Sequence, residues 1–155
     1  MNHAERNTPK VTVDIIIELI DWDRHHKEVP CIVLIERKNE PMGFALPGGF
    51  VDVGERAIDA AIREALEETT LRLTNIKQFH TYTSPGRDPR GHGISIVYVA
   101  QAIGDPKGED DAKQAFAADP IGLSGKITDS LCFDHRQIIT DYINWKLTGH
   151  RPLGE

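Results

Sequence analysis

The sequence predicts an α/β protein in which helices cover both faces of a mixed sheet, that is, an α/β/α sandwich. Runs rich in β-branched residues stand before and after a central helix-forming segment, and the chain closes with a second segment of helical spacing. A chain of 155 residues forms one domain that buries about two-thirds of its unfolded surface. We therefore expect a single domain over 1–155, with residues 1–10 and 148–155 as flexible tails.

The strands expected in the first half are short and β-branched, at Val11–Ile20 and Cys31–Ile35. The charged segment between them contains His25 and His26, which we interpret as part of a solvated loop, with metal binding as the alternative. A third short stretch, Phe44–Leu46, leads into a turn with two consecutive glycines, and glycine allows a close approach of the backbone to another group.

A helix is predicted from Glu55 to about Thr69. The apolar residues expected to face the core are Ile58, Ile62, Ala65 and Leu66. Beyond the helix, strands are predicted at Leu73–Thr83 and Ile94–Ile103, a helical turn at Ala112–Ala117, and a last helix after Asp134. In that last helix, Asp134 and Gln137 match a capping box.

Three carboxylates, Glu64, Glu67 and Glu68, fall at i, i+3 and i+4 of the predicted helix and are therefore neighbours on one face. At an effective dielectric of about 20, each like-charge pair repels by about 3 kcal/mol. The last two also lie where the helix dipole disfavours anions. A bound divalent cation removes both penalties, and oxygen ligands suit Mg²⁺ or Mn²⁺. The alternative is a solvated acidic face in which Arg63 pairs with Glu67.

These residues match a longer pattern, in which a glycine, a glutamate, an Arg-Glu pair, two further glutamates and an apolar residue follow at fixed spacing. The matching positions are Gly49, Glu55, Arg63, Glu64, Glu67, Glu68 and Leu71. The stretch resembles the Nudix box, whose family fold is an α/β/α sandwich with a mixed central sheet. Thr70 departs from the family's glycine and Ala65 from its larger apolar residue. Since that glycine normally supplies a left-handed cap, we expect the helix to end differently here.

The resemblance implies a metal-dependent pyrophosphohydrolase. It implies that Mg²⁺, with Mn²⁺ as a substitute, is held by Glu64, Glu67, Glu68 and the carbonyl of Gly48. Arg63 would orient these carboxylates, and Glu55 would pair with Arg63 or reach a metal through water. By the same analogy the general base comes from a later loop. Its candidates are Glu109, Asp110 and Asp111, and the alternative for each is an exposed acidic turn.

The segment 84–93 contains Arg87 and Arg90, and arginine is suited to phosphate recognition. Together with Pro85 it is similar to the corresponding segment of ADP-ribose pyrophosphatases within the family. The alternative is a structural surface loop. For stacking on the base of a nucleotide we consider Phe44 and Trp145, each of which is equally interpretable as a core aromatic.

Composition and net charge limit the kinds of ligand and partner that we expect for this protein. The net charge of −6 and the absence of a basic stripe argue against a nucleic-acid binder, so we expect a small-molecule nucleotide as ligand. Because no apolar run approaches the length of a membrane span, we expect a cytoplasmic protein with no membrane association. The 2 cysteines are too few for a disulfide framework. A homodimer is expected from the resemblance alone.

The first hypothesis is a Mg²⁺-dependent hydrolase that cleaves ADP-ribose, or a similar nucleoside diphosphate derivative, to AMP and ribose 5-phosphate. The second is a nucleoside triphosphate pyrophosphohydrolase that releases a nucleoside monophosphate and pyrophosphate. The third is a non-catalytic ADP-ribose sensor, because similar domains occur fused to transcription factors. Only eight residues follow Leu147, which leaves no room for a DNA-binding helix pair there.

Overall fold

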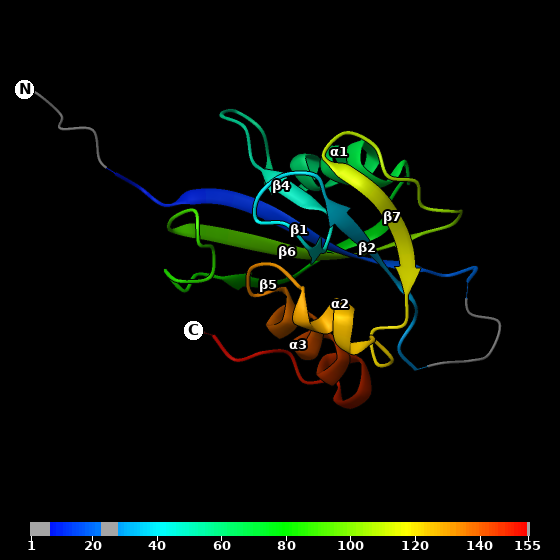
Figure 1. Cartoon of the computed structure of the whole chain (residues 1–155). Helices are drawn as coiled ribbons and strands as arrows, with labels where there is room; N and C mark the ends of the chain where they lie inside the picture. Colours follow the sequence, from blue (N-terminus) through cyan, green and yellow to red (C-terminus); the bar gives the residue numbers. More distant parts are fainter. Residues whose placement is uncertain (1–6, 23–27, 155) are drawn as a thin grey trace, which may run out of the picture.

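The computed structural model describes residues 7–22 and 28–154, and it confirms the α/β sandwich (Figure 1). His25 and His26 lie outside the described residues. The elements along the chain are β1 (Lys10–Leu19), β2 (Ile32–Arg37), β3 (Phe44–Ala45), β4 (Gly48–Phe50), α1 (Ala57–Thr69), β5 (Thr74–Tyr82), β6 (Gly93–Ala102), β7 (Ala112–Ala118), α2 (Gly125–Asp129) and α3 (His135–Thr148).

The sheet is mixed because one central pair of strands is parallel. Its strands follow the order β3-β2-β1-β6-β5, while β4 pairs with β1 and β7 pairs with β2. Strands β1 and β6 run parallel, and the other pairs are antiparallel. Helix α1 lies on one side of the sheet, and α2 and α3 lie on the other (Figure 1).

Strand β1 lies in the middle of the sheet and serves both halves of the core. Val13, Ile15 and Ile17 pack in the cluster that contains the buried alanines of α1, whereas Ile16 packs in the cluster that contains α3. The alternate positions Asp14 and Glu18 therefore point to the side of α3, as the two-residue period of a strand requires. Both carboxylates are buried, at 8% and 4% exposure.

Residues of α3 supply partners for both buried acids of β1. Glu18 accepts hydrogen bonds from the hydroxyl of Tyr142, at 2.7 Å, and from Nζ of Lys146, at 2.8 Å. Asp14 is met by His135, with Nε2 at 3.2 Å from the carboxylate. Buried carboxylates need such partners, so the two acids fix how α3 lies on the sheet.

Helix α1 forms where it was expected, and Ile58 and Ala65 pack in the core as predicted, but the other two residues of the predicted core face do not. Ile62 and Leu66 are 43% and 41% exposed, while Ala60, Ala61 and Ala65 are fully buried. The small alanine side chains let the helix lie close to the sheet. The unusual alanine of the family pattern is therefore part of the packing surface.

The end of α1 also differs from the prediction. Thr70 takes the left-handed conformation itself, with φ of 63°, and its N–H donates to the carbonyl of Leu66. The helix thus ends with the same cap geometry that a glycine would give. The missing glycine changes the conformational cost of this cap and not its shape.

Two further expectations are corrected. Residues 112–118 form strand β7 beside β2 and not a helical turn. Asp134 makes no side-chain capping bond at the start of α3, because its carboxylate binds Arg87. Beyond α3, Arg151 donates to the carbonyls of Gln78 and Phe79 in β5.

Within the described residues, no helix has the length and apolar character needed to cross a membrane. Cys31 and Cys132 are not joined in a disulfide.

Candidate active site

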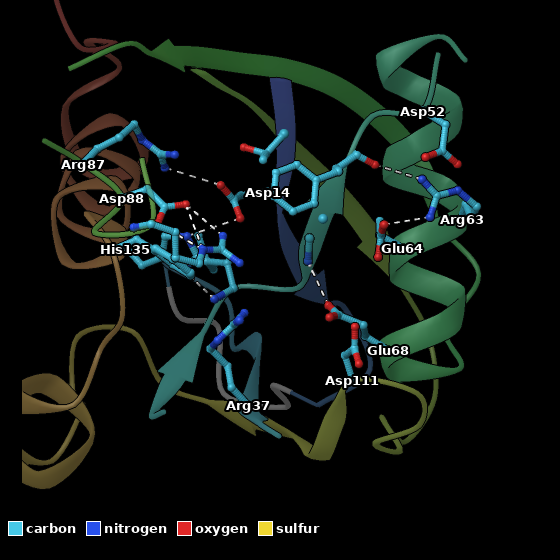
Figure 2. A pocket seen from close by; sticks show the side chains of 17 residues that line it. Asp14, Arg37, Asp52, Arg63, Glu64, Glu68, Arg87, Asp88, Asp111 and His135 are labelled. Atoms are coloured by element: carbon cyan, nitrogen blue, oxygen red, sulfur yellow. Dashed lines mark hydrogen bonds and ion pairs between the residues drawn. The ribbon is translucent and has the colours of Figure 1, made fainter. Parts of the chain in front are cut away.

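A polar cavity of about 190 Å³ lies between α1 and the residues that precede and begin α3 (Figure 2). Glutamates of α1 form one wall, and a cluster around Asp14 forms the opposite wall (Figure 2). The charged residues that line it are Asp14, Arg37, Asp52, Arg63, Glu64, Glu68, Arg87, Asp88, Arg90, Asp111 and His135. The cavity therefore brings acids and arginines from distant parts of the chain to one place.

The two glycines of the turn are required by close approach. A Cβ added to Gly49 would overlap the carboxylate of Glu64, and one added to Gly48 would overlap the backbone carbonyl of Val13. The backbone of β4 thus fits between β1 and α1 only because these residues have no side chain. This contact places the turn directly against the acids of the helix.

Arg63 is the centre of an ion-pair network on α1 (Figure 2). Its Nε and one terminal nitrogen bind the two oxygens of Glu55 at 2.8 and 2.9 Å, and its other terminal nitrogen binds Glu64 at 2.7 Å. Glu67 is farther, at 3.4 Å, and the carbonyl of Phe50 accepts a further bond at 3.0 Å. The predicted pairing of Glu55 with Arg63 is confirmed, and Arg63 fixes the acids relative to the glycine turn.

The carboxyl groups of this wall have very different affinities for protons. The bidentate bond from Arg63 lowers the pKa of Glu55 to about 2. Burial raises the pKa of Glu64 despite its contact with Arg63. Burial raises the pKa of Glu68 to about 8, although the N–H of Gly48 donates to its Oε2 at 2.9 Å. Among residues 7–22 and 28–154, no basic side chain forms an ion pair with Glu68.

The acids are close to one another but do not form a closed metal cage. In the part of the chain that the structure describes, no three Asp, Glu, His or Cys side chains stand together as a ready metal site. Glu64 and Glu67 are turned toward Arg63, whereas Glu68 is buried, forms no ion pair among the described residues, and has a raised pKa despite the charge of Arg37. A buried carboxyl whose pKa is raised by desolvation is the group that a divalent cation would stabilise, and its oxygens are the ligands that Mg²⁺ prefers.

The opposite wall is built around Asp14, which sequence reasoning did not select. Its carboxylate accepts bonds from the hydroxyl of Ser95 and from Nε2 of His135, and it lies 3.6 Å from Arg87. Burial acts to raise the pKa of Asp14, but the interactions with His135, Ser95 and Arg87 outweigh it, so the pKa is lowered. These partners therefore favour the ionised form of Asp14.

His135 connects this wall to the glycine turn. Its Nδ1 accepts the backbone N–H of Leu46 at 2.9 Å, so the ring proton is on Nε2, which faces Asp14. The turn is thereby held at both ends, by His135 through Leu46 and by Glu68 through Gly48. His135 is 1% exposed, so water does not compete for these bonds.

The two arginines of the loop between β5 and β6 are placed differently. Arg87 lines the cavity, but its side chain is 4% exposed and forms a bidentate pair with Asp134 at 2.9 and 2.6 Å. Arg90 also lines the cavity, is exposed, and is paired with Asp88. Arg90 is thus the loop arginine that an incoming anion can reach, while Arg87 maintains the wall.

Aromatic rings alternate with cations along the rim. The guanidinium of Arg90 lies 4.9 Å from the ring centre of Phe133 and 5.5 Å from that of Phe50. Arg37 lies over Phe133 at 5.1 Å, and Lys10 over Phe50 at 5.5 Å. Such cation–π contacts stabilise charge beside an apolar surface. Phe133 has a φ of 57°, a strained backbone that holds its ring at the cavity.

Several predicted site residues do not line the cavity. Of the three candidates for the base, Asp111 lines it (Figure 2), whereas Glu109 and Asp110 do not. Pro85 is exposed outside it, and Phe44 packs edge-on against Phe116, 5.7 Å between ring centres. Trp145 packs against Phe79 on α3's side of the sheet. The core interpretation of both aromatics is the one that the structure supports.

Comparison with known proteins identifies the family to which the chain belongs. Residues 9–122 match the NUDIX domain. The chain is 46% identical over 142 residues to an ADP-ribose pyrophosphatase of Methanocaldococcus jannaschii, covering 89% of this chain and 75% of the other. The acid-rich helix against a glycine turn defines a hydrolase of this class, and the chain belongs to the Nudix family.

Solved structures agree with the assignment. A MutT/nudix family protein from Enterococcus faecalis superposes with a TM-score of 0.76 at 28% identity, covering 98% of this chain and 68% of the other. The NUDIX domain of Shewanella oneidensis NrtR complexed with ADP ribose superposes with a TM-score of 0.72 at 25% identity, covering 91% of this chain and 90% of that domain.

Proposed function

We propose that the protein hydrolyses the pyrophosphate bond of ADP-ribose, or of a similar nucleoside diphosphate derivative, to AMP and ribose 5-phosphate, and that the reaction depends on Mg²⁺. The observation that supports this most is that one cavity contains both the buried Glu68, which forms no ion pair among the described residues, and a rim of arginines. An anionic substrate and its cation both find a partner there. The similarity to the pyrophosphatase of Methanocaldococcus jannaschii supports the choice of substrate.

The metal would be held by the acids of α1 and by the backbone of the turn. Glu64, Glu67 and Glu68 provide carboxylate oxygens, and the carbonyl of Gly48 is the proposed backbone ligand. When bound, Mg²⁺ supplies charge neutralisation of the pyrophosphate and acidifies a coordinated water. The raised pKa values of Glu64 and Glu68 fit such a site, because burial disfavours the charge of both carboxyl groups and a bound cation would offset that effect.

The remaining side chains orient the acids and the substrate. Arg63 holds Glu64 and Glu55 in place against the turn. Arg37 and Arg90 present guanidinium groups to the phosphates from the rim. Asp111 is our candidate for the general base, because it alone of the three acids before β7 lines the cavity. Its carboxylate would accept the proton of the attacking water.

The phosphorus NMR spectrum of the products tests this function. With ADP-ribose, two phosphomonoester signals should appear when millimolar Mg²⁺ is present and should be absent in chelator. Release of inorganic pyrophosphate from nucleoside triphosphates at a higher kcat/KM would favour the second hypothesis instead. Glu68→Gln serves as the matched control for contaminating activity.

Binding without hydrolysis would support the third hypothesis. The NUDIX domain of NrtR was crystallised with ADP ribose, so a similar fold binds that molecule in another protein. Calorimetric titration of ADP-ribose in Ca²⁺ and in Mg²⁺, combined with the phosphorus spectra, separates a sensor from an enzyme. Homodimerisation and a cytoplasmic location stay predictions.

A further inference from the structure

A second cavity adjoins the first and is larger, at about 640 Å³. The two cavities share Thr12, Phe50, Asp88 and Arg90 in their linings. The second extends from this shared border along the start of β1 and the end of the β5–β6 loop. Its further lining residues are Asn7, Thr8, Pro9, Lys10, Gly91, His92 and Gly93.

The first cavity is too small to hold a whole dinucleotide-like substrate. Sites for small molecules usually enclose about 300–1,000 Å³, whereas the cavity beside the acids of α1 has about 190 Å³. That space suits a metal ion and phosphate groups. The rest of the substrate must lie outside it, and the second cavity continues directly from it.

The ring of Phe50 is the main apolar surface on the border. Phe50 follows the glycine turn in β4, and 43% of its surface is exposed. Its backbone is fixed, because its carbonyl accepts a bond from Arg63. The ring is flanked by Lys10 and Arg90, each 5.5 Å from its centre. A flat aromatic group can stack on this exposed ring by taking the place of one of the two cations that lie over it.

Arg90 stands at the junction of the two cavities. Asp88 holds its guanidinium through bonds of 3.1, 3.2 and 2.8 Å. The guanidinium also contacts the rings of Phe50 and Phe133. A cation at this position can contact phosphates that enter the first cavity. A group attached to those phosphates then extends past Arg90 toward Phe50.

We propose that the second cavity is the subsite for the nucleoside end of the substrate, with Phe50 as the surface on which the base stacks. The inference rests on the proposed function in that it assumes a nucleoside attached to a pyrophosphate. A base has an aromatic face to stack, whereas the sugar phosphate at the other end has none. Phe50 is therefore a specificity-determining residue, and it selects substrates that carry a base.

Product inhibition separates the two ends of the substrate. AMP and ribose 5-phosphate are each used as competitive inhibitors of ADP-ribose hydrolysis, with the wild type, Phe50→Leu and Phe50→Tyr. Loss of the ring should raise the inhibition constant of AMP by about 5- to 160-fold, the range of base–aromatic stacking, and leave that of ribose 5-phosphate unchanged. Tyrosine keeps the aromatic face and should restore AMP binding.

Val53→Ala is the matched control, because Val53 is fully exposed in the same segment and lines neither cavity. An unchanged inhibition constant of AMP in Phe50→Leu would overturn the inference, as would a selective loss of ribose 5-phosphate binding. If the wild type does not hydrolyse ADP-ribose, the proposed function fails by itself. Calorimetric titration of AMP into the wild type and Phe50→Leu then decides the stacking role independently.

Discussion

Two buried carboxyl groups, Asp14 and Glu68, face each other across the cavity and differ in how the protein treats them. Their exposures are similar, 8% and 4%. The pKa of Asp14 is lowered by His135, Ser95 and Arg87 against the effect of burial, while burial raises the pKa of Glu68 to about 8. Asp14 has charged and polar partners within the protein, whereas Glu68 forms no ion pair among the described residues, and we propose that a bound cation is its partner. A buried carboxyl group that lacks an ion-pair partner in the protein thus indicates where a cation can bind.

The largest expected effect is on turnover in Glu68→Gln. The amide can still accept the N–H of Gly48, so the turn is retained, but the charge that would hold the cation is lost. We expect kcat to fall at least about 100-fold, with metal-free stability unchanged or higher. Steady-state kinetics and urea unfolding in chelator measure both. Retained activity together with a large loss of metal-free stability would show that Glu68 is structural.

The reverse result is expected for Asp14→Ala. This substitution leaves His135, Ser95 and the buried Arg87 without their shared partner, so we expect a loss of about 3–5 kcal/mol in the free energy of unfolding. Urea unfolding in chelator gives the value. Asp129→Ala, which removes an exposed pair with Arg136, should leave the unfolding midpoint nearly unchanged. If Asp14→Ala lowered the free energy of unfolding no more than Asp129→Ala does, the carboxylate of Asp14 would not stabilise its wall of the cavity.

The two walls should also differ in their dependence on pH. Glu68 keeps its proton in the folded protein up to about pH 8, whereas the unfolded chain loses it near 4.5. The unfolded state therefore binds fewer protons in this window, and metal-free stability falls as pH rises, by up to about 1.4 kcal/mol per pH unit. Asp14, with its lowered pKa, contributes stability that is lost only as pH falls below its usual range.

Urea unfolding in chelator at pH 5, 6, 7 and 8 measures this dependence, with Glu68→Gln as the comparison. The variant should lack the decline that the wild type shows. Added Mg²⁺ should stabilise the wild type increasingly toward pH 8, because metal and proton compete for the same carboxyl group. A decline of equal size in both proteins would assign the titration to another group.

The smallest effect is expected at the end of the acidic helix. Thr70 adopts a left-handed conformation that costs a non-glycine residue about 1 kcal/mol. Thr70→Gly should therefore raise the free energy of unfolding by about 0.5–1 kcal/mol, without a change in kcat. Thr70→Ala retains the Cβ and should not stabilise. A stabilisation shared by both variants would mean that backbone conformation is not its cause.

Local sequence spacing was enough to predict that Glu64 and Glu68 lie close together, and both line the cavity, whereas Glu67 does not line it and the opposite wall was not predicted. Glu64, Glu67 and Glu68 are neighbours through the helix repeat, and the glycines precede them directly. Asp14 and His135, in contrast, meet only because α3 lies on the same sheet face as alternate residues of β1. A lone aspartate in a β-branched run was the available signal, since a strand buried on both faces keeps such a charge only where a partner meets it.

The remaining errors follow from tertiary packing that overrides local preference. Residues 112–118 contain several alanines and favour a helix, yet they form β7 because β2 offers a free edge. Ile62 and Leu66 have the spacing of a core face, but the closer approach of alanines decided which side of α1 faces the sheet. Asp134 was expected to cap α3, and a buried arginine took its carboxylate instead.

The parallel pairing of β1 with β6 also sets the order in which the molecule can be assembled. The hydrogen bond from Ser95 to Asp14 closes a separation of 81 residues, and that from Leu46 to His135 closes one of 89. Contacts of such high contact order form slowly, because a long loop must close before they contribute. A nascent chain leaving the ribosome can form the glycine turn and its acidic helix early, but Asp14 remains without its histidine until nearly the whole sequence has emerged.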